Sequence, residues 1–334
     1  MEISEVLDAR DWWPRAQAQQ REAHARTAGR LYRQSRGLKN PIEDFLWEYY
    51  PLRPSWLARW HPGFDSLGRS IALAEPEPSM GADYELAHQY WAELGARRWH
   101  EILEAQGGRA VAVTDQYAQD RAHGINFLYQ LLRTVQDREP SFGCLGWHEW
   151  AMVYRTRSRS RGDGDGASVE ESAASPFTRH DLPLRLGADR TNEIVEAAHI
   201  RCTHFDAYRF FTPAAAPLNH VQPAYERVLE LDQPGCIHVN MDLLRACIQL
   251  GPLVPGELML ACFDLALKAR RVDMAASPYD CSSIGLKPIT IETAQGKAQY
   301  IAVQQQISRE ARPLRDQLLA LLAPLAAAAA ASSA

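Results

Sequence analysis

The sequence has no long hydrophobic run and no excess of basic charge. Apart from an alanine-dominated stretch near its end, the 334-residue chain has no run of about 18 apolar residues, so we predict no membrane span. The formal net charge of −5 argues against a general electrostatic grip on nucleic acid, which depends on clustered lysine and arginine. The first residues, MEISEVLDARDWW, are acidic and lack the basic-then-apolar pattern of a signal peptide. We therefore expect a cytoplasmic protein.

Cysteine is sparse and has no motif spacing. The six cysteines are irregularly placed, and no Cys-x-x-Cys pair occurs. Several of them, such as Cys247 and Cys262, stand among apolar residues, so we expect reduced and mostly buried thiols. The sequence also lacks a Gly-x-Ser-x-Gly motif, which leaves nucleophilic catalysis poorly supported.

The length and composition predict a globular protein with a sizeable core. An apolar fraction of 46% and a charged fraction of 23% are ordinary for such proteins. We predict an N-terminal helix in residues 1–39 and one compact catalytic or binding domain in residues 40–315. Residues 316–334 should be the end of a C-terminal helix with an alanine-rich tail. Residues 157–176 are rich in Gly, Ser and charge of both signs, so we expect a disordered loop there.

The periodicity predicts an α+β fold that is mainly α. Apolar residues recur at helical spacing in several segments, which predicts helices at 5–37, 83–106, 117–137, 147–155, 237–250 and 255–277. A small antiparallel sheet is expected around residues 182–211, where β-branched residues alternate with polar ones. If residues 200–206 form a strand, His204 and Asp206 point to the same face of it.

Imidazole and carboxylate side chains are concentrated in two separate blocks. The first block, residues 199–242, runs through aromatic and apolar residues, and the second, residues 141–155, carries His148 and Glu149. The ionisable residues considered in the first block are His199, His204, Asp206, His220, His238 and Asp242. Such groups are costly to bury unless they pair or have a function. We therefore predict that the fold brings the two blocks together in one pocket.

Several segments resemble a bacterial protein family that is frequent in actinobacteria. They are NPIEDFLWEYYPLRP, FGCLGWHEWAMVYR, HIRCTHFDAYRFFTP, QPGCIHVNMD, PLVPGELMLACFDLALKARRVDMAASPYD and ITIETAQGKAQY. The resemblance covers roughly residues 40–315, and the family is commonly labelled 3-methyladenine DNA glycosylase. It implies a hydrolase that cleaves an N-glycosidic bond, without a cofactor, and releases a damaged or modified nucleobase from DNA or a nucleoside.

Under this hypothesis, one carboxylate orients water and stabilises positive charge on the sugar. Glu149, Asp206 or Asp242 could supply that carboxylate. His204 could hydrogen-bond the flipped base or fix the carboxylate, and His148 is the remaining catalytic candidate. The candidate substrate-binding residues are two aromatic side chains that could stack on the base, two arginines that could contact phosphate, and one amide: Trp147, Tyr208, Arg155, Arg209 and Asn240. A structural ion pair between Asp206 and Arg209 is the alternative explanation for those two residues.

Two other classes of function remain open from the residues alone. The first is a non-haem metalloenzyme that acts on a small molecule, because imidazole and carboxylate side chains bind iron, manganese and zinc. Its candidate ligands are His148, His204, Asp206, His238 and Asp242. The second is a protein that binds a small ligand in the same pocket without turnover.

Overall fold

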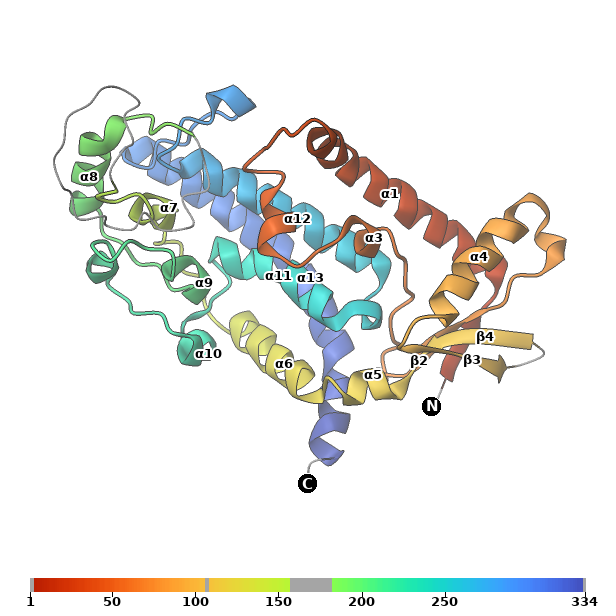
Figure 1. Cartoon of the computed structure of the whole chain (residues 1–334). Helices are drawn as coiled ribbons and strands as arrows, with labels where there is room; N and C mark the ends of the chain where they lie inside the picture. The colour runs from red at the N-terminus through yellow and green to blue at the C-terminus, as the bar shows by residue number, and fades with distance from the viewer. Residues whose placement is uncertain (1–2, 106–107, 157–181, 333–334) are drawn as a thin grey trace, which may run out of the picture.

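The computed structural model describes residues 3–105, 108–156 and 182–332 of the chain (Figure 1). The predicted class is confirmed, because the fold is about 60% helical and contains one small mixed sheet. None of the helices in these three ranges is both long and apolar enough to cross a membrane. The loop predicted at 157–176 lies outside the described residues.

The elements follow one another along the chain in this way. The longer helices are α1 (Ala9–Ser35), α4 (Tyr84–Gly95), α6 (Ala122–Gln136), α8 (Gly187–Ala197), α11 (Ile237–Leu250), α12 (Gly256–Ala276) and α13 (Ala294–Ser332). The short helices are α2 (Phe45–Tyr49), α3 (Pro54–Leu57), α5 (Asp115–Gln119), α7 (Trp147–Ala151), α9 (Phe205–Tyr208) and α10 (Val228–Leu231). The strands are β1 (Ile3–Leu7), β2 (Ser70–Ala74), β3 (His100–Ala105) and β4 (Gly108–Val113). The 3-10 segments are η1 (Pro78–Asp83), which is kinked at Gly81, and the single turns η2 (Ala216–Leu218), η3 (Tyr225–Arg227), η4 (Gly251–Leu253) and η5 (Ser282–Ile284).

Long helices form the core. α11 and α12 follow each other through a short turn and pack side by side, while α13 lies against both of them and against α6. One buried apolar cluster runs through these helices and includes Met241, Phe263 and Leu322. The predictions for 237–250 and 255–277 are confirmed, because both segments carry apolar residues around most of the helix and have a clear break between them.

The sheet lies at the opposite end of the molecule from α7, α8 and α9 (Figure 1). Its strand order is β1-β2-β4-β3; β1 pairs with β2 in parallel, and the other neighbours are antiparallel. α1 and α4 cover it through a cluster that includes Trp12, Leu73, Trp91 and Val111. The sheet therefore stabilises the N-terminal part of the fold and contributes nothing to the site described below.

The position predicted for the sheet is wrong. Residues 182–211 form α8 and α9, with two isolated bridges in place of paired strands. The segment 200–206 is extended only as far as His204, whose Nδ1 accepts a hydrogen bond from the backbone N–H of Ala207 at 3.3 Å and so caps α9. The alternation of polar and apolar residues therefore reflects an extended connector and a helix cap.

Four predicted helices differ in extent from the structure. The helix predicted at 117–137 is divided into α5 and α6, and the one predicted at 147–155 ends at Ala151. The helix predicted at 5–37 begins only at Ala9, where Asp8 caps it, and the residues before it form β1. The helix predicted at 83–106 ends at Gly95, and the chain then returns as β3. A Cβ atom on Gly95 would lie 2.7 Å from Ile102, so the glycine permits the close packing of this strand against the end of α4.

Candidate metal centre and pocket

A tight backbone turn places α7 in the interior. Leu145 and Gly146 have φ values of 53° and 75°, and α7 starts immediately after them, as predicted. A Cβ atom on Gly146 would lie 3.3 Å from Ala276, so the turn packs directly against the end of α12. His148 and Glu149 on α7 are consequently buried.

A second turn joins this segment to α11. The side-chain carbonyl of Gln233 accepts from the backbone N–H of Ser141 at 2.8 Å, and its amide donates to the Ser141 carbonyl at 3.0 Å. A Cβ atom on Gly235 would lie only 2.4 Å from that same carbonyl oxygen. The contact therefore requires glycine, and it brings together the two sequence blocks that carry His148 and His238.

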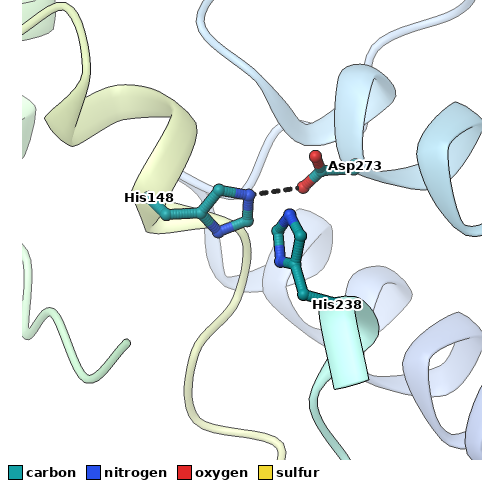
Figure 2. Close-up of side chains that lie close together, drawn as sticks. All are labelled: His148, His238 and Asp273. Atoms are coloured by element: carbon teal, nitrogen blue, oxygen red, sulfur yellow. Dashed lines mark ion pairs between the residues drawn. The ribbon is translucent and has the colours of Figure 1, made fainter. Parts of the chain in front are cut away.

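Three buried side chains from three helices converge in the interior: His148 from α7, His238 from α11 and Asp273 from α12 (Figure 2). Their possible ligand atoms all lie within 4.8 Å of one another. Nε2 of His148 is 2.8 Å from Oδ1 of Asp273, and the two imidazole rings meet edge to face with centroids 4.5 Å apart. His238 is the most exposed of the three at 7%.

Two of these atoms form a buried ion pair and have no hydrogen-bond partner outside it. Nε2 of His148 and Oδ1 of Asp273 are both buried, and although they are close, their geometry is not that of a hydrogen bond. A buried charged group costs free energy unless it is paired or coordinates a metal. Ligands of one ion, each about 2.0–2.2 Å from it, have this kind of short mutual separation without bonding each other. The cluster is therefore a candidate site for a divalent metal ion.

The electrostatics of the cluster are those of a buried ion pair between His148 and Asp273, and a metal ion that binds there has to displace the His148 proton. Burial lowers the pKa of His238 well below its ordinary value, so its ring is neutral and able to bind metal. Burial also opposes charge on His148, but the Asp273 carboxylate overrides it and raises the pKa of His148 well above the usual range. Burial acts to raise the pKa of Asp273, and the neighbouring His148 and Arg270 lower it instead. The carboxylate is thus ionised and available as a ligand.

A buried arginine holds the far side of Asp273. Nη1 of Arg270 is 3.0 Å from Oδ2 of Asp273 and 2.6 Å from Oε1 of Glu149, and all three side chains are buried. Oδ1 of Asp273 therefore remains directed at the histidines. On the other side, Sγ of Cys144 lies 4.0 Å from Nδ1 of His148. Such outer contacts orient ligands in metal sites.

His204 and Asp242 form a separate pair beside the cluster. Because Nδ1 of His204 accepts the cap hydrogen bond of α9, its Nε2 carries the proton and faces Oδ2 of Asp242 at 3.3 Å. Tyr50 donates to the other oxygen of Asp242 at 2.8 Å. The His204 ring lies nearly parallel to His238, with centroids 5.2 Å apart. This pair supports His238 and does not join the three ligand atoms.

Asp206 is held by cations. Its Oδ2 lies 2.5 Å from Arg245 and accepts from Tyr49 at 3.0 Å, while Oδ1 lies 3.2 Å from Arg209. The ion pair between Asp206 and Arg209 that the sequence left open is therefore present. Asp206 stands outside the metal cluster, which takes two of the five predicted ligands, His148 and His238.

A pocket of about 850 Å³ lies beside the cluster. It is formed by residues 39–49, α7, α9, α11, α12 and the chain after α12. Four of the residues singled out from the sequence line it, namely Glu149, Asp206, Arg209 and His238. His238 belongs to both the pocket and the cluster, so an ion bound there would lie at the pocket wall.

The other candidate substrate-binding residues lie away from this pocket. Trp147 is buried against Trp150, and the Tyr208 hydroxyl donates to Gln222. Arg155 is an exposed partner of Glu196. Asn240 is fully buried; its amide donates to the Pro234 carbonyl and its oxygen accepts from Arg315. Packing or local hydrogen bonding explains each of them.

Asp273 and Arg270 were not identified from the sequence. They lie three residues apart on α12, on a side that also carries Phe263, Ala266 and Ala269, all buried. Two charged side chains on an apolar face of a helix are the signal that could have identified them, since such groups are buried only when paired or functional.

Comparison with protein-family models, with curated proteins and with solved structures finds no match to this chain. The donor set of the cluster is therefore the feature of the chain that bears on its function. Two imidazoles and one carboxylate on one side of an ion leave open coordination positions, an arrangement used by iron enzymes and, with zinc, by hydrolases.

Proposed function

We propose that the protein is a metal-dependent enzyme that acts on a small molecule. The observation that carries this proposal is the convergence of His148, His238 and Asp273, whose possible ligand atoms lie within 4.8 Å of one another beside a pocket. Structural zinc sites usually have four protein ligands, whereas catalytic sites have three and keep a position open. Three ligands beside a pocket therefore favour a catalytic centre.

The chain's own residues would hold this centre rigidly. Arg270 fixes Oδ2 of Asp273, and the thiol of Cys144 lies against the far side of the His148 ring. The His204 ring lies flat beside His238. A divalent cation bound here would supply Lewis-acid polarisation or, in the case of iron, redox chemistry.

Release of a damaged nucleobase, which the family resemblance implies, has less support from the geometry. That chemistry needs one carboxylate free to act on water. Glu149 is held by Arg270, Asp206 by Arg245, and Asp242 by His204 and Tyr50: each candidate is already engaged. A nucleobase is still among the planar molecules that are small enough for the pocket of about 850 Å³. Non-catalytic binding of a small ligand would need the pocket alone.

A cytoplasmic location is part of this proposal. All six cysteines are free thiols, and five of them are buried. Such usage is typical of proteins in reducing compartments.

The test is the metal content of the purified full-length chain. We expect close to one equivalent of iron, manganese or zinc per chain by mass spectrometry, or after reconstitution of chelator-treated protein. His238→Gln and Asp273→Asn should each lose most of that metal, because each removes one of three ligands. Matched controls are His199→Gln, at an exposed histidine, and Asp264→Asn, at a surface position on the same helix as Asp273.

The outcome separates the proposals. Retention of metal by both ligand variants would place the ion elsewhere and reject the site. Failure of the folded wild-type chain to bind any of the three metals would reject the metalloenzyme.

A further inference from the structure

Aromatic side chains form part of the pocket lining. The rings of Phe45 and Tyr49 stack with centroids 5.0 Å apart and planes 14° from parallel, and both residues line the pocket. Phe210 and Tyr279 also contribute to the lining. Such surfaces favour a planar, apolar body because aromatic rings stack in offset or edge-on geometries.

The acidic groups of the lining are largely neutralised by the protein. Three of them are each held by an arginine: Asp44 by Arg33 at 2.8 Å, Asp206 by Arg245 at 2.5 Å and Glu149 by Arg270 at 2.6 Å. The fourth, Glu48, is exposed to water, where its charge is screened. The negative charge of the lining therefore has little influence on a ligand.

Donor groups of the same lining remain available. Within the described ranges, Lys39 has no ion-pair partner, and its side chain is exposed. Arg209 has a side chain that is 48% exposed, lies over the Phe210 ring at 4.7 Å and pairs with Asp206 through Nε at 3.2 Å. The Asn40 oxygen already accepts two backbone N–H groups at 3.0 Å, which leaves its Nδ2 donor as the group that can meet a ligand.

From this combination we propose that the pocket binds a small organic anion, a carboxylate or a phosphate ester, attached to a planar apolar ring. The ring lies against Phe45 and Tyr49, and Lys39, Arg209 and Asn40 hold the anionic group. This substrate class builds on the proposed metal-dependent function, since a cation at His238 would add positive charge to the same pocket.

The experiment is calorimetric titration of the full chain with four probes that share one ring system: 2-naphthoate, 2-naphthyl phosphate, 2-naphthamide and 2-naphthylmethylamine. We expect at least one of the two anions to bind about tenfold or more tightly than the neutral amide, and the amine to bind weakest. Comparison of the two anions identifies carboxylate or phosphate as the preferred group.

Variants locate the anionic group. Lys39→Met and Arg209→Gln should each lower the affinity for the preferred anion by about fivefold or more, because each removes one charge-assisted contact. Neither variant should change the affinity for the neutral amide. The control is Arg312→Gln, at an exposed arginine on α13 that does not line the pocket. It should change neither the affinity for the anion nor the affinity for the amide.

The metal content of every preparation is measured in parallel, with the titrations repeated on metal-free protein. Absence of metal contradicts the proposed function. The preference for the anion over the amide, and its loss in the two variants, can still be measured on the metal-free protein. Binding of neither anion, equal binding of anion and amide, or anion affinities that Lys39→Met and Arg209→Gln leave unchanged would overturn the anion proposal, whether or not metal is present.

Discussion

Replacement of Arg270 by methionine should destabilise the protein strongly. Arg270 is 2% exposed, and its Nη1 bridges Glu149 at 2.6 Å and Asp273 at 3.0 Å. Its guanidinium also lies 4.0 Å from the centre of the Phe45 ring. Methionine would fill much of the space but leave two buried carboxylates without this cation.

The magnitude follows from the burial of all three groups. Removal of one partner of a buried ion pair costs about 3–5 kcal/mol, mostly because the remaining charge has no compensation. A second change, Glu149→Gln, removes one of the uncompensated charges, so the double variant should recover about 1–3 kcal/mol relative to Arg270→Met. The two substitutions should therefore be strongly non-additive.

Urea denaturation followed by tryptophan fluorescence and circular dichroism measures these free energies of unfolding. Arg271→Met is the matched control, since Arg271 is the next residue, 53% exposed, and pairs with Glu43 at 3.2 Å. It should change stability by no more than about 0.5 kcal/mol. An equal effect of the two arginine variants, or simple additivity of Arg270→Met with Glu149→Gln, would refute the description of this buried triad.

Three further predictions test other parts of the structure. Burial raises the pKa of Asp232 from 3.8 to about 6, so the folded state binds a proton that the unfolded state releases, and stability falls as pH rises through this range. Asp232→Asn should therefore match wild type near pH 3.5 and exceed its free energy of unfolding by about 3 kcal/mol above pH 7; a pH-independent difference in urea titrations would contradict this. Gly235→Ala should cost about 1–3 kcal/mol and lower metal occupancy, because its Cβ would collide with the Ser141 carbonyl; an unchanged melting temperature would count against that contact. Chelator-treated protein should release no free methylpurine from alkylated DNA, whereas metal-independent release abolished by Glu149→Gln or Asp206→Asn would support the glycosylase hypothesis instead.

Local sequence patterns predicted those helices in which apolar residues recur at helical spacing without interruption. α11 and α12 were predicted nearly to the residue because a glycine and prolines separate two runs of helical spacing. The sheet was misplaced partly because β2 is distant in sequence from β4, so pairing between Ser70–Ala74 and Gly108–Val113 leaves no local signal. The β3–β4 pairing is local, but His100–Ala105 was assigned to the end of the helix predicted at 83–106. At residues 200–206, alternation was ambiguous between a strand and an extended connector that ends in a helix cap.

The sequence predicted two of the three residues of the candidate site. His148 and His238 stood out because each lies in a dense polar block within apolar sequence. Asp273 did not, because a single carboxylate among the basic residues of a long helix resembles an ordinary surface charge. Only the packing of α12 against α7 and α11 decides that this carboxylate is buried between two histidines.

Anomalous X-ray scattering from crystals of the full chain grown with stoichiometric zinc or iron tests the metal centre most directly. We predict one strong anomalous peak about 2.0–2.3 Å from a ring nitrogen of His148, a ring nitrogen of His238 and Oδ1 of Asp273. A metal-loaded crystal with no peak among these three residues, or with its peak at the exposed His199 and His220 pair, would contradict it.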